Sequence, residues 1–240
     1  AMLALNVSSE ILNAFKVVNR SINTSNDVIT GKNQVTYEAF KKDLEDPQTK
    51  AKAAIWAPKA EQVQKLSGDL FNYIEDLKLS LKKEADLKIG KDGKEDFRED
   101  NLDASTRLMD KKEKGKELYN KLGEFKKQLI AVLKPEEFAD NPTLQAQIKA
   151  KIKEQQKTLP VDLTVPKSQS GKEYSNDAKG WTTNYFHMTP TVAALTILSK
   201  FQNDVKNSES QMVDYCHQQI GAVKVVFDQF QAIATSNTTY

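Results

Sequence analysis

The chain has 240 residues, of which 39% are hydrophobic and 28% charged, and only 9 Gly and 7 Pro interrupt it, a composition that favours few long elements over many short strands. Its 35 basic and 33 acidic side chains leave a net charge of +2, which gives no electrostatic reason to expect nucleic acid or an anionic membrane as a partner. The single cysteine, Cys216, excludes a disulfide within the chain, so packing must hold the fold.

The first predicted element is a long helix over residues 3–45. Its apolar positions recur at helical spacing and form one stripe: Ile11, Phe15, Val18, Ile22 and Ile29. Asp46-Pro47 ends this helix and can begin the next one, because an acidic cap followed by proline in the first turn is a helix-start signal. We expect Pro58 to break or restart that next helix.

Two further long helices follow. The first covers residues 59–89, with a seam of alternating three- and four-residue spacing: Val63, Leu66, Leu70, Tyr73, Leu77 and Leu81. A polar stretch with two glycines, residues 90–100, predicts a turn between antiparallel neighbours. The next helix covers 103–134, where Pro135 stops it. Its stripe is Leu118, Leu122, Phe125, Leu129 and Val132.

The last third of the chain is less regular. Asn141-Pro142 opens a shorter helix that fades before Pro160. Apolar alternation at Val161, Leu163 and Val165, a polar stretch, and a Thr- and aromatic-rich run predict a small β-hairpin at about residues 160–188. Thr189-Pro190 then starts a final helix that runs to about residue 234.

These elements predict an all-α fold, an elongated up-and-down bundle of long helices with a small β-hairpin insertion before the last helix. We expect one domain over residues 1–235, with residues 236–240 as a linker to a further domain. No segment approaches the ~18 consecutive apolar residues of a membrane-spanning helix. Because the chain begins Ala-Met-Leu-Ala-Leu without a basic leader, we expect it to be cut from a longer protein, just after a hydrophobic segment.

The residues that usually carry chemistry are few and badly placed for it. His187 and His217 lie thirty residues apart, and adjacent helix positions such as Cys216 and His217 point about 100° apart. The carboxylates fall on solvated faces, and the chain has no phosphate loop and no Glu-x-x-His pair. We therefore predict no catalytic residue, no cofactor and no metal site.

One aromatic group stands out as a possible site of partner binding. It consists of Trp181, Tyr185, Phe186 and Met188. Two interpretations stay open: the group plugs the end of the bundle, or it forms a docking surface, since aromatic and Met side chains are enriched in interface cores.

Two stretches resemble the GldM/PorM family. Residues 1–15 resemble the end of its membrane helix and the first periplasmic turns. Residues 181–209 resemble the signature of its N-terminal domain, with Pro190, the run Ala193 to Thr196 and the run Leu198 to Asn207. The rest of the chain matches only in helical pattern.

The resemblance implies a component of the type IX secretion and gliding-motility machinery. It implies a periplasmic domain of a protein anchored in the inner membrane, a homodimeric rod, and β-rich domains after residue 240. The implied partners are a GldL/PorL-type membrane protein, which makes a proton-driven motor with it, and GldK/GldN (PorK/PorN)-type proteins at the outer membrane. Proton coupling would lie outside this chain.

Three classes of function remain to be weighed. The leading hypothesis is a non-enzymatic structural domain that transmits force, because packed long helices resist bending. The alternative is a helical protein-binding module that docks a partner or a cell-surface ligand, and an enzyme is the third. A concave apolar pocket would favour the alternative, and an apolar strip shared between two copies would favour the structural domain.

If the domain is a rod that links two partners, the first and last residues of the chain must lie at opposite ends of the bundle. If the segment before the last helix returns the chain to its starting end, the last helix runs parallel to the first. We therefore predict that Leu3 and Ala234 lie at opposite ends of the domain, more than ~50 Å apart by helix length. The aromatic group should then lie in the half nearer the start of the first helix.

Overall fold

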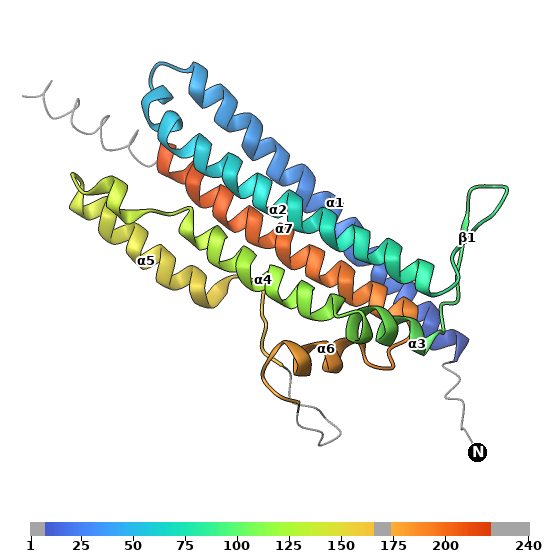
Figure 1. Cartoon of the computed structure of the whole chain (residues 1–240). Helices are drawn as coiled ribbons and strands as arrows, with labels where there is room; N and C mark the ends of the chain where they lie inside the picture. Colours follow the sequence, from blue (N-terminus) through green and yellow to red (C-terminus); the bar gives the residue numbers. More distant parts are fainter. Residues whose placement is uncertain (1–7, 166–173, 222–240) are drawn as a thin grey trace, which may run out of the picture.

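The computed structural model describes residues 8–165 and 174–221 of the chain (Figure 1). Its elements, in order, are α1 (Ser9–Glu45), α2 (Lys50–Glu84), β1 (Lys88–Ile89), β2 (Glu95–Asp96), α3 (Leu102–Ser105), the π-helix η1 (Thr106–Lys111), α4 (Lys114–Ala131), the 3-10 helix η2 (Pro135–Phe138), α5 (Pro142–Thr158), α6 (Ala178–Phe186) and α7 (Thr191–Gly221). The fold class predicted from the sequence is confirmed: long helices form an elongated bundle, and a small antiparallel hairpin precedes the last helix.

Local sequence explains most of the helix starts. The side chains of Ser8, Asn101, Asn141 and Asp177 each accept a hydrogen bond from a backbone N–H in the first turn of the helix that follows, which satisfies donors that have no partner inside the helix. Pro142 occupies the first position of α5, where its missing N–H costs nothing.

The hairpin lies elsewhere than predicted. Lys88 pairs with Asp96 and Ile89 with Glu95, so the hairpin falls within the stretch expected to be only a turn. Trp181 to Phe186, expected as a strand, belongs to helix α6, which the Asp177 cap begins. Residues 160–165 form no strand, and 166–173, the tip of the predicted hairpin, lie outside the described residues. The aromatic and Thr content suggested a strand, but packing against α4 and α7 decided for a helix.

Two helix boundaries also differ from the prediction. Helix α2 starts at Lys50 and continues through Pro58, because Trp56, Ala57 and Ala60 are buried on either side of the proline and tertiary packing keeps the helix continuous. The helix expected over 103–134 is divided into α3, η1 and α4. Glu113, at the start of α4, has a left-handed backbone with φ of 53°, which ends the π-helix before α4 begins.

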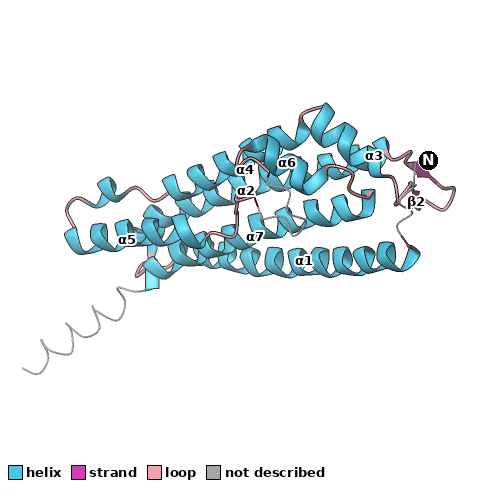
Figure 2. Cartoon of the chain, turned by 90° about the horizontal axis from the view of Figure 1, so that it is seen from below, coloured by secondary structure: helices cyan, strands magenta, loops and turns pink. Residues whose placement is uncertain are grey.

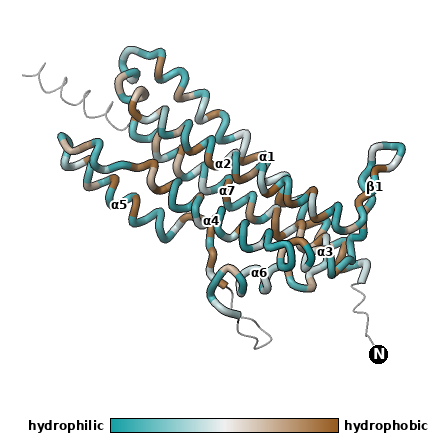
Figure 3. Tube along the Cα trace, viewed as in Figure 1, coloured by the Kyte–Doolittle hydropathy of each residue, from teal (hydrophilic) through white to brown (hydrophobic). Residues whose placement is uncertain are grey.

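The apolar core lies between α2, α4 and α7. The predicted seams of α2 and α4 supply it, and Leu77, Leu118 and Leu122 are among its covered side chains. Helix α1 lies along one side of this core (Figure 2). Along the long helices, hydrophobic and hydrophilic positions alternate, as expected for helices with one face toward a core (Figure 3).

Helices α1 and α7 run parallel. Asn203 of α7 bonds Asn26, Asn33 bonds the carbonyl of Lys206, and Tyr37 bonds Glu209, so the offset in residue number stays between 172 and 177 along the pair. The start of α1 and the end of α7 consequently lie at opposite ends of the bundle (Figure 1). The predicted direction of the last helix is confirmed for the described residues, whereas Leu3 and Ala234 themselves lie outside them.

Candidate interaction surfaces

The predicted aromatic group lies mainly in the core. Trp181 is fully buried, and its ring lies 5.1 Å from Phe201, 5.1 Å from Tyr185 and 5.6 Å from Tyr119, measured between centroids. Phe186 is also fully buried, with its centroid 6.0 Å from that of Trp181. These aromatic contacts join α4, α6 and α7, and α6 lies against the side of the bundle (Figure 1).

The other two members of the group are more accessible. Tyr185 is half-buried, and burial raises the pKa of its hydroxyl. Met188 is 48% exposed and has a left-handed backbone with φ of 52°, and its N–H donates to the Thr106 hydroxyl at 2.8 Å. Trp181 and Phe186 are therefore part of the core, whereas Tyr185 and Met188 are accessible at the surface. Partner binding through Tyr185 and Met188 stays a prediction.

Helix α6 can approach the bundle closely because the second residue of α4 is a glycine. A Cβ atom at Gly115 would lie 2.3 Å from the Thr182 methyl group and 2.9 Å from the carbonyl of Met109. No side chain fits there, so Gly115 is what lets α6 lie against the start of α4 and bring Trp181 into the core.

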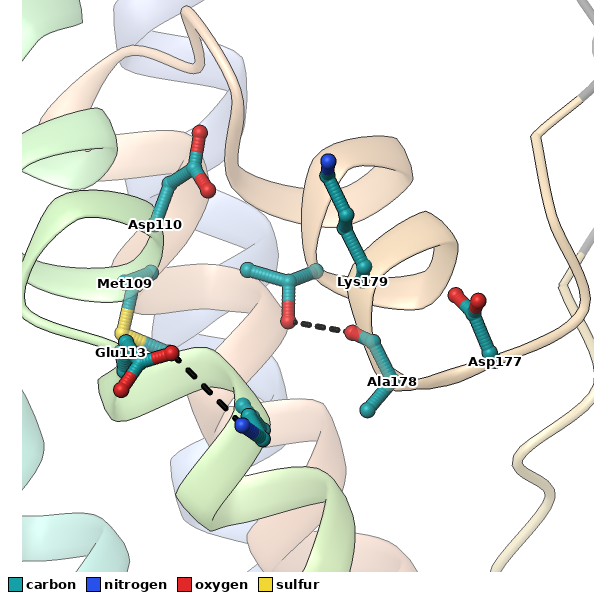
Figure 4. Close-up of a pocket in the computed structure, with 8 residues that line it drawn as sticks. Met109, Asp110, Glu113, Asp177, Ala178 and Lys179 are labelled. Carbon is teal, nitrogen blue, oxygen red and sulfur yellow. Dashed lines mark hydrogen bonds and ion pairs between the residues drawn. The ribbon is translucent and has the colours of Figure 1, made fainter.

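An open pocket of about 450 Å³ lies between η1, the start of α4 and α6 (Figure 4). Charged side chains of both signs line it: Asp110, Glu113, Lys116, Asp177 and Lys179. Asp177 already caps α6, which lowers the pKa of its carboxyl through the hydrogen bond from Gly180 N–H, and Glu113 faces Lys116 at 3.6 Å. These groups neutralise one another around an open polar surface, an arrangement that does not assemble a nucleophile with its base.

Cys216 and the adjacent His217 lie in different surroundings. Cys216 is fully buried, which raises the pKa of its thiol to about 12. His217 turns away from it and pairs with Asp43 at 3.0 Å, with its ring 5.1 Å from that of Phe40. Within residues 8–165 and 174–221, no three His, Cys, Asp or Glu side chains are grouped as metal ligands would be.

The outer face of α1 carries an apolar strip. Val17 is 66% exposed, and Val28 and Val35 are each 67% exposed. Between them lie the exposed small residues Ser21, Thr24 and Gly31. The six positions are spaced four, three, four, three and four residues apart, which is the heptad spacing of a coiled-coil seam. Together they cover about 27 Å of helix at 1.5 Å per residue.

The sequence stripe predicted for this helix is a different one. Phe15, Ile22 and Ile29 are half-buried, whereas Ile11 is 51% and Val18 48% exposed, so none of the five is buried. The outer strip was missed because its Ser, Thr and Gly members do not register as hydrophobic. The signal that could have found it is the three-four spacing of the valines with small residues between them.

The inner face of α1, which contacts α7, combines the half-buried Phe15, Ile22 and Ile29 with buried polar side chains. Between Ser9 and Thr36 the only buried side chains are those of Asn26 and Asn33. Asn26 accepts from Asn203 at 2.9 Å, and Asn33 donates to the Lys206 carbonyl at 3.4 Å. Helix α1 therefore buries asparagines and exposes valines, the reverse of the usual arrangement.

The inner face becomes more firmly held toward the C-terminal end of α1. There the Tyr37 hydroxyl donates to Glu209 at 2.9 Å, and Lys206 pairs with the same carboxylate at 2.8 Å. Glu209 is 2% exposed, and burial beside it raises the pKa of the Tyr37 hydroxyl. The buried Phe40 ring adds the apolar contact with His217.

Comparison with known proteins finds one family. A family model described as the GldM N-terminal domain matches residues 10–219. No curated protein matches the chain. In the described parts of the chain, none of the helices is both long and apolar enough to cross a membrane.

Proposed function

From the premise that this chain belongs to the GldM N-terminal domain family, a component of the gliding and type IX secretion machinery, we propose that it is a structural domain that transmits force. In this proposal it is a non-enzymatic periplasmic link in a protein anchored in the inner membrane. The full-length protein joins a GldL/PorL-type membrane partner to GldK/GldN (PorK/PorN)-type partners at the outer membrane.

One observation carries this proposal: the first and last described helices run parallel, so the start of α1 and the end of α7 lie at opposite ends of the bundle. A chain held at both ends is then loaded along the helix axes, and the apolar core between α2, α4 and α7 resists their separation. If both ends lay together, the domain would be a side arm that carries no load.

We further propose that the outer strip of α1 is where a second copy pairs. In a parallel pair, Val28 and Val35 take the first position of successive heptads, and Thr24 and Gly31 the fourth. The small residues permit a close approach of the two helices.

The alternative function, a helical module that binds a partner or ligand in a pocket, receives less support. It requires a concave apolar pocket. The pocket between η1, α4 and α6 is open and charged, whereas the apolar strip of α1 lies on an exposed helix face. The strip favours association of two copies along their length.

The pairing is tested by placing a charge in the strip. Val28→Lys is expected to raise the dissociation constant of the full-length dimer at least ~10-fold, because two lysines would be desolvated at the seam. Light scattering across a concentration series measures this. Ile55→Lys, at a residue of α2 with a 47% exposed side chain, is the matched control and should leave the constant unchanged. Equal behaviour of the two variants would place the interface elsewhere.

The role in force transmission is tested by removing the domain from the full-length protein. Deletion of residues 9–221, with the flanking segments joined, is expected to abolish gliding and type IX secretion. The shortened protein should still enter the inner membrane and co-purify with the GldL/PorL-type partner, because coupling to protons lies outside this domain. Cells that still secrete with the shortened protein would contradict the proposal.

A further inference from the structure

The contrast between the two ends of α1 has a mechanical consequence. From Ser9 to Thr36, 28 residues, α1 contributes two fully buried side chains, both asparagines, whereas the 35 residues of α2 contribute twelve. Helices are held together mainly by the burial of apolar surface. The N-terminal three quarters of α1 is therefore attached mainly by the half-buried Phe15, Ile22 and Ile29 and by hydrogen bonds, whose net contribution in water is small.

Some polar atoms of α1 are covered without a partner. Of the eight such side-chain atoms among the described residues, two lie on α1, Asn19 Oδ1 and Asn33 Oδ1, and both precede Tyr37. Opening of this part of α1 would let water bond both atoms.

The C-terminal quarter of α1 is different in kind. Tyr37 and Phe40 are 7% and 3% exposed, Tyr37 bonds the buried Glu209, and Asp43 pairs with His217. Opening this part would uncover two aromatic rings and a buried carboxylate. The boundary between the two regimes falls between Asn33 and Tyr37.

We infer that α1 is a hinged arm: residues 9–33 open from α7 as a unit while residues 37–45 stay attached to the bundle. Once separated from α7, the arm loses the packing that stabilises it as a helix, so its backbone amides can exchange with water. The outer valine strip moves with it, so a partner bound to that strip stays bound. In a domain that transmits force, compliance would then lie at the start of the bundle and stiffness in the core of α2, α4 and α7.

The test is native-state hydrogen exchange of the whole chain, read by mass spectrometry. It is done in the Val28→Lys background so that a second copy on the strip does not protect the arm, which separates this inference from the proposed dimer. Peptides from 9–33 are expected to exchange ~100-fold faster than those from 37–45 and from the middle of α2, by local opening. If peptides before Asn33 and after Tyr37 showed the same protection from exchange, whether high or low, the inference would be overturned.

A pair of crosslinks shows whether separation from α7 causes the exchange. Cysteines at Asn26 and Asn203, joined by a short bismaleimide, should slow exchange in 9–33 at least ~10-fold relative to the same variant left unlinked. Cysteines at Asp43 and His217, joined in the same way, should not change it, because that end is already attached. Native Cys216 is buried with a raised thiol pKa and stays unmodified. Equal effects of both links would show that the arm does not hinge at its C-terminal end.

Discussion

Replacing Trp181 with alanine is expected to lower the free energy of unfolding by about 3–5 kcal/mol, the range measured when a large buried aromatic is truncated. The ring is fully buried and lies between Tyr119 of α4, Tyr185 of α6 and Phe201 of α7. Its removal would leave a cavity where three helices meet, and the rigid neighbouring rings would collapse into it only in part. Urea unfolding followed by circular dichroism measures the loss without relying on Trp181 fluorescence.

Met188 supplies the matched control for this prediction. It lies in the same sequence cluster, but its side chain is largely exposed, so Met188→Ala should change the free energy of unfolding by less than about 0.5 kcal/mol. If both substitutions were equally mild, the aromatic group would not be part of the core. The result would then favour a surface role for all four residues.

Removing the charge of Lys206 is expected to have a comparable effect by a different mechanism. Lys206→Met leaves the Glu209 carboxylate buried, with only the Tyr37 hydroxyl still donating to it. Breaking a buried ion pair by removing one partner typically costs about 3–5 kcal/mol, because the remaining charge stays desolvated. The same urea unfolding measurement at neutral pH gives the loss.

Two further variants distinguish this explanation from a simple loss of packing. The double substitution Lys206→Met with Glu209→Gln removes both charges and should recover most of the lost stability. Lys32→Met breaks the pair with Asp214, in which the lysine side chain is 58% exposed, and should cost less than about 1 kcal/mol. A Lys206→Met loss no larger than that of Lys32→Met would mean that Glu209 is well solvated.

Together, these predictions divide the molecule into parts with different properties. The core at Trp181 and the buried pair at Glu209 lie on α7 or beside it, where the bundle is tightly held. The arm of α1 has neither a covered aromatic ring nor a buried charge until Tyr37. We expect core substitutions to cause large losses in the free energy of unfolding and rapid amide exchange to be confined to residues 9–33. This combination would show a rigid core with one weakly attached helix.

The sequence by itself determined the helical class and most of the helix positions. The stripes of α2 and α4 follow a simple rule, because apolar side chains at three- and four-residue spacing bury together on one face, and Leu70, Leu77, Leu118 and Leu122 all lie in the core as expected. The cap signal at Asn141 is equally local. The parallel direction of the last helix also followed from the sequence, because the connecting segment was long enough to return the chain.

Features that depend on contacts between residues far apart in the sequence were decided only by the tertiary structure. Pro58 does not interrupt α2, and Trp181 to Phe186 form a helix, because packing outweighs local preference at both places. The two faces of α1 show this most clearly: Val28 is exposed and Asn26 is covered because α7 presents Asn203 and Ser199 to that side of the helix. The pattern of apolar residues in α1 does not reveal how polar α7 is. The polarity of α7, however, determines which face of α1 is buried.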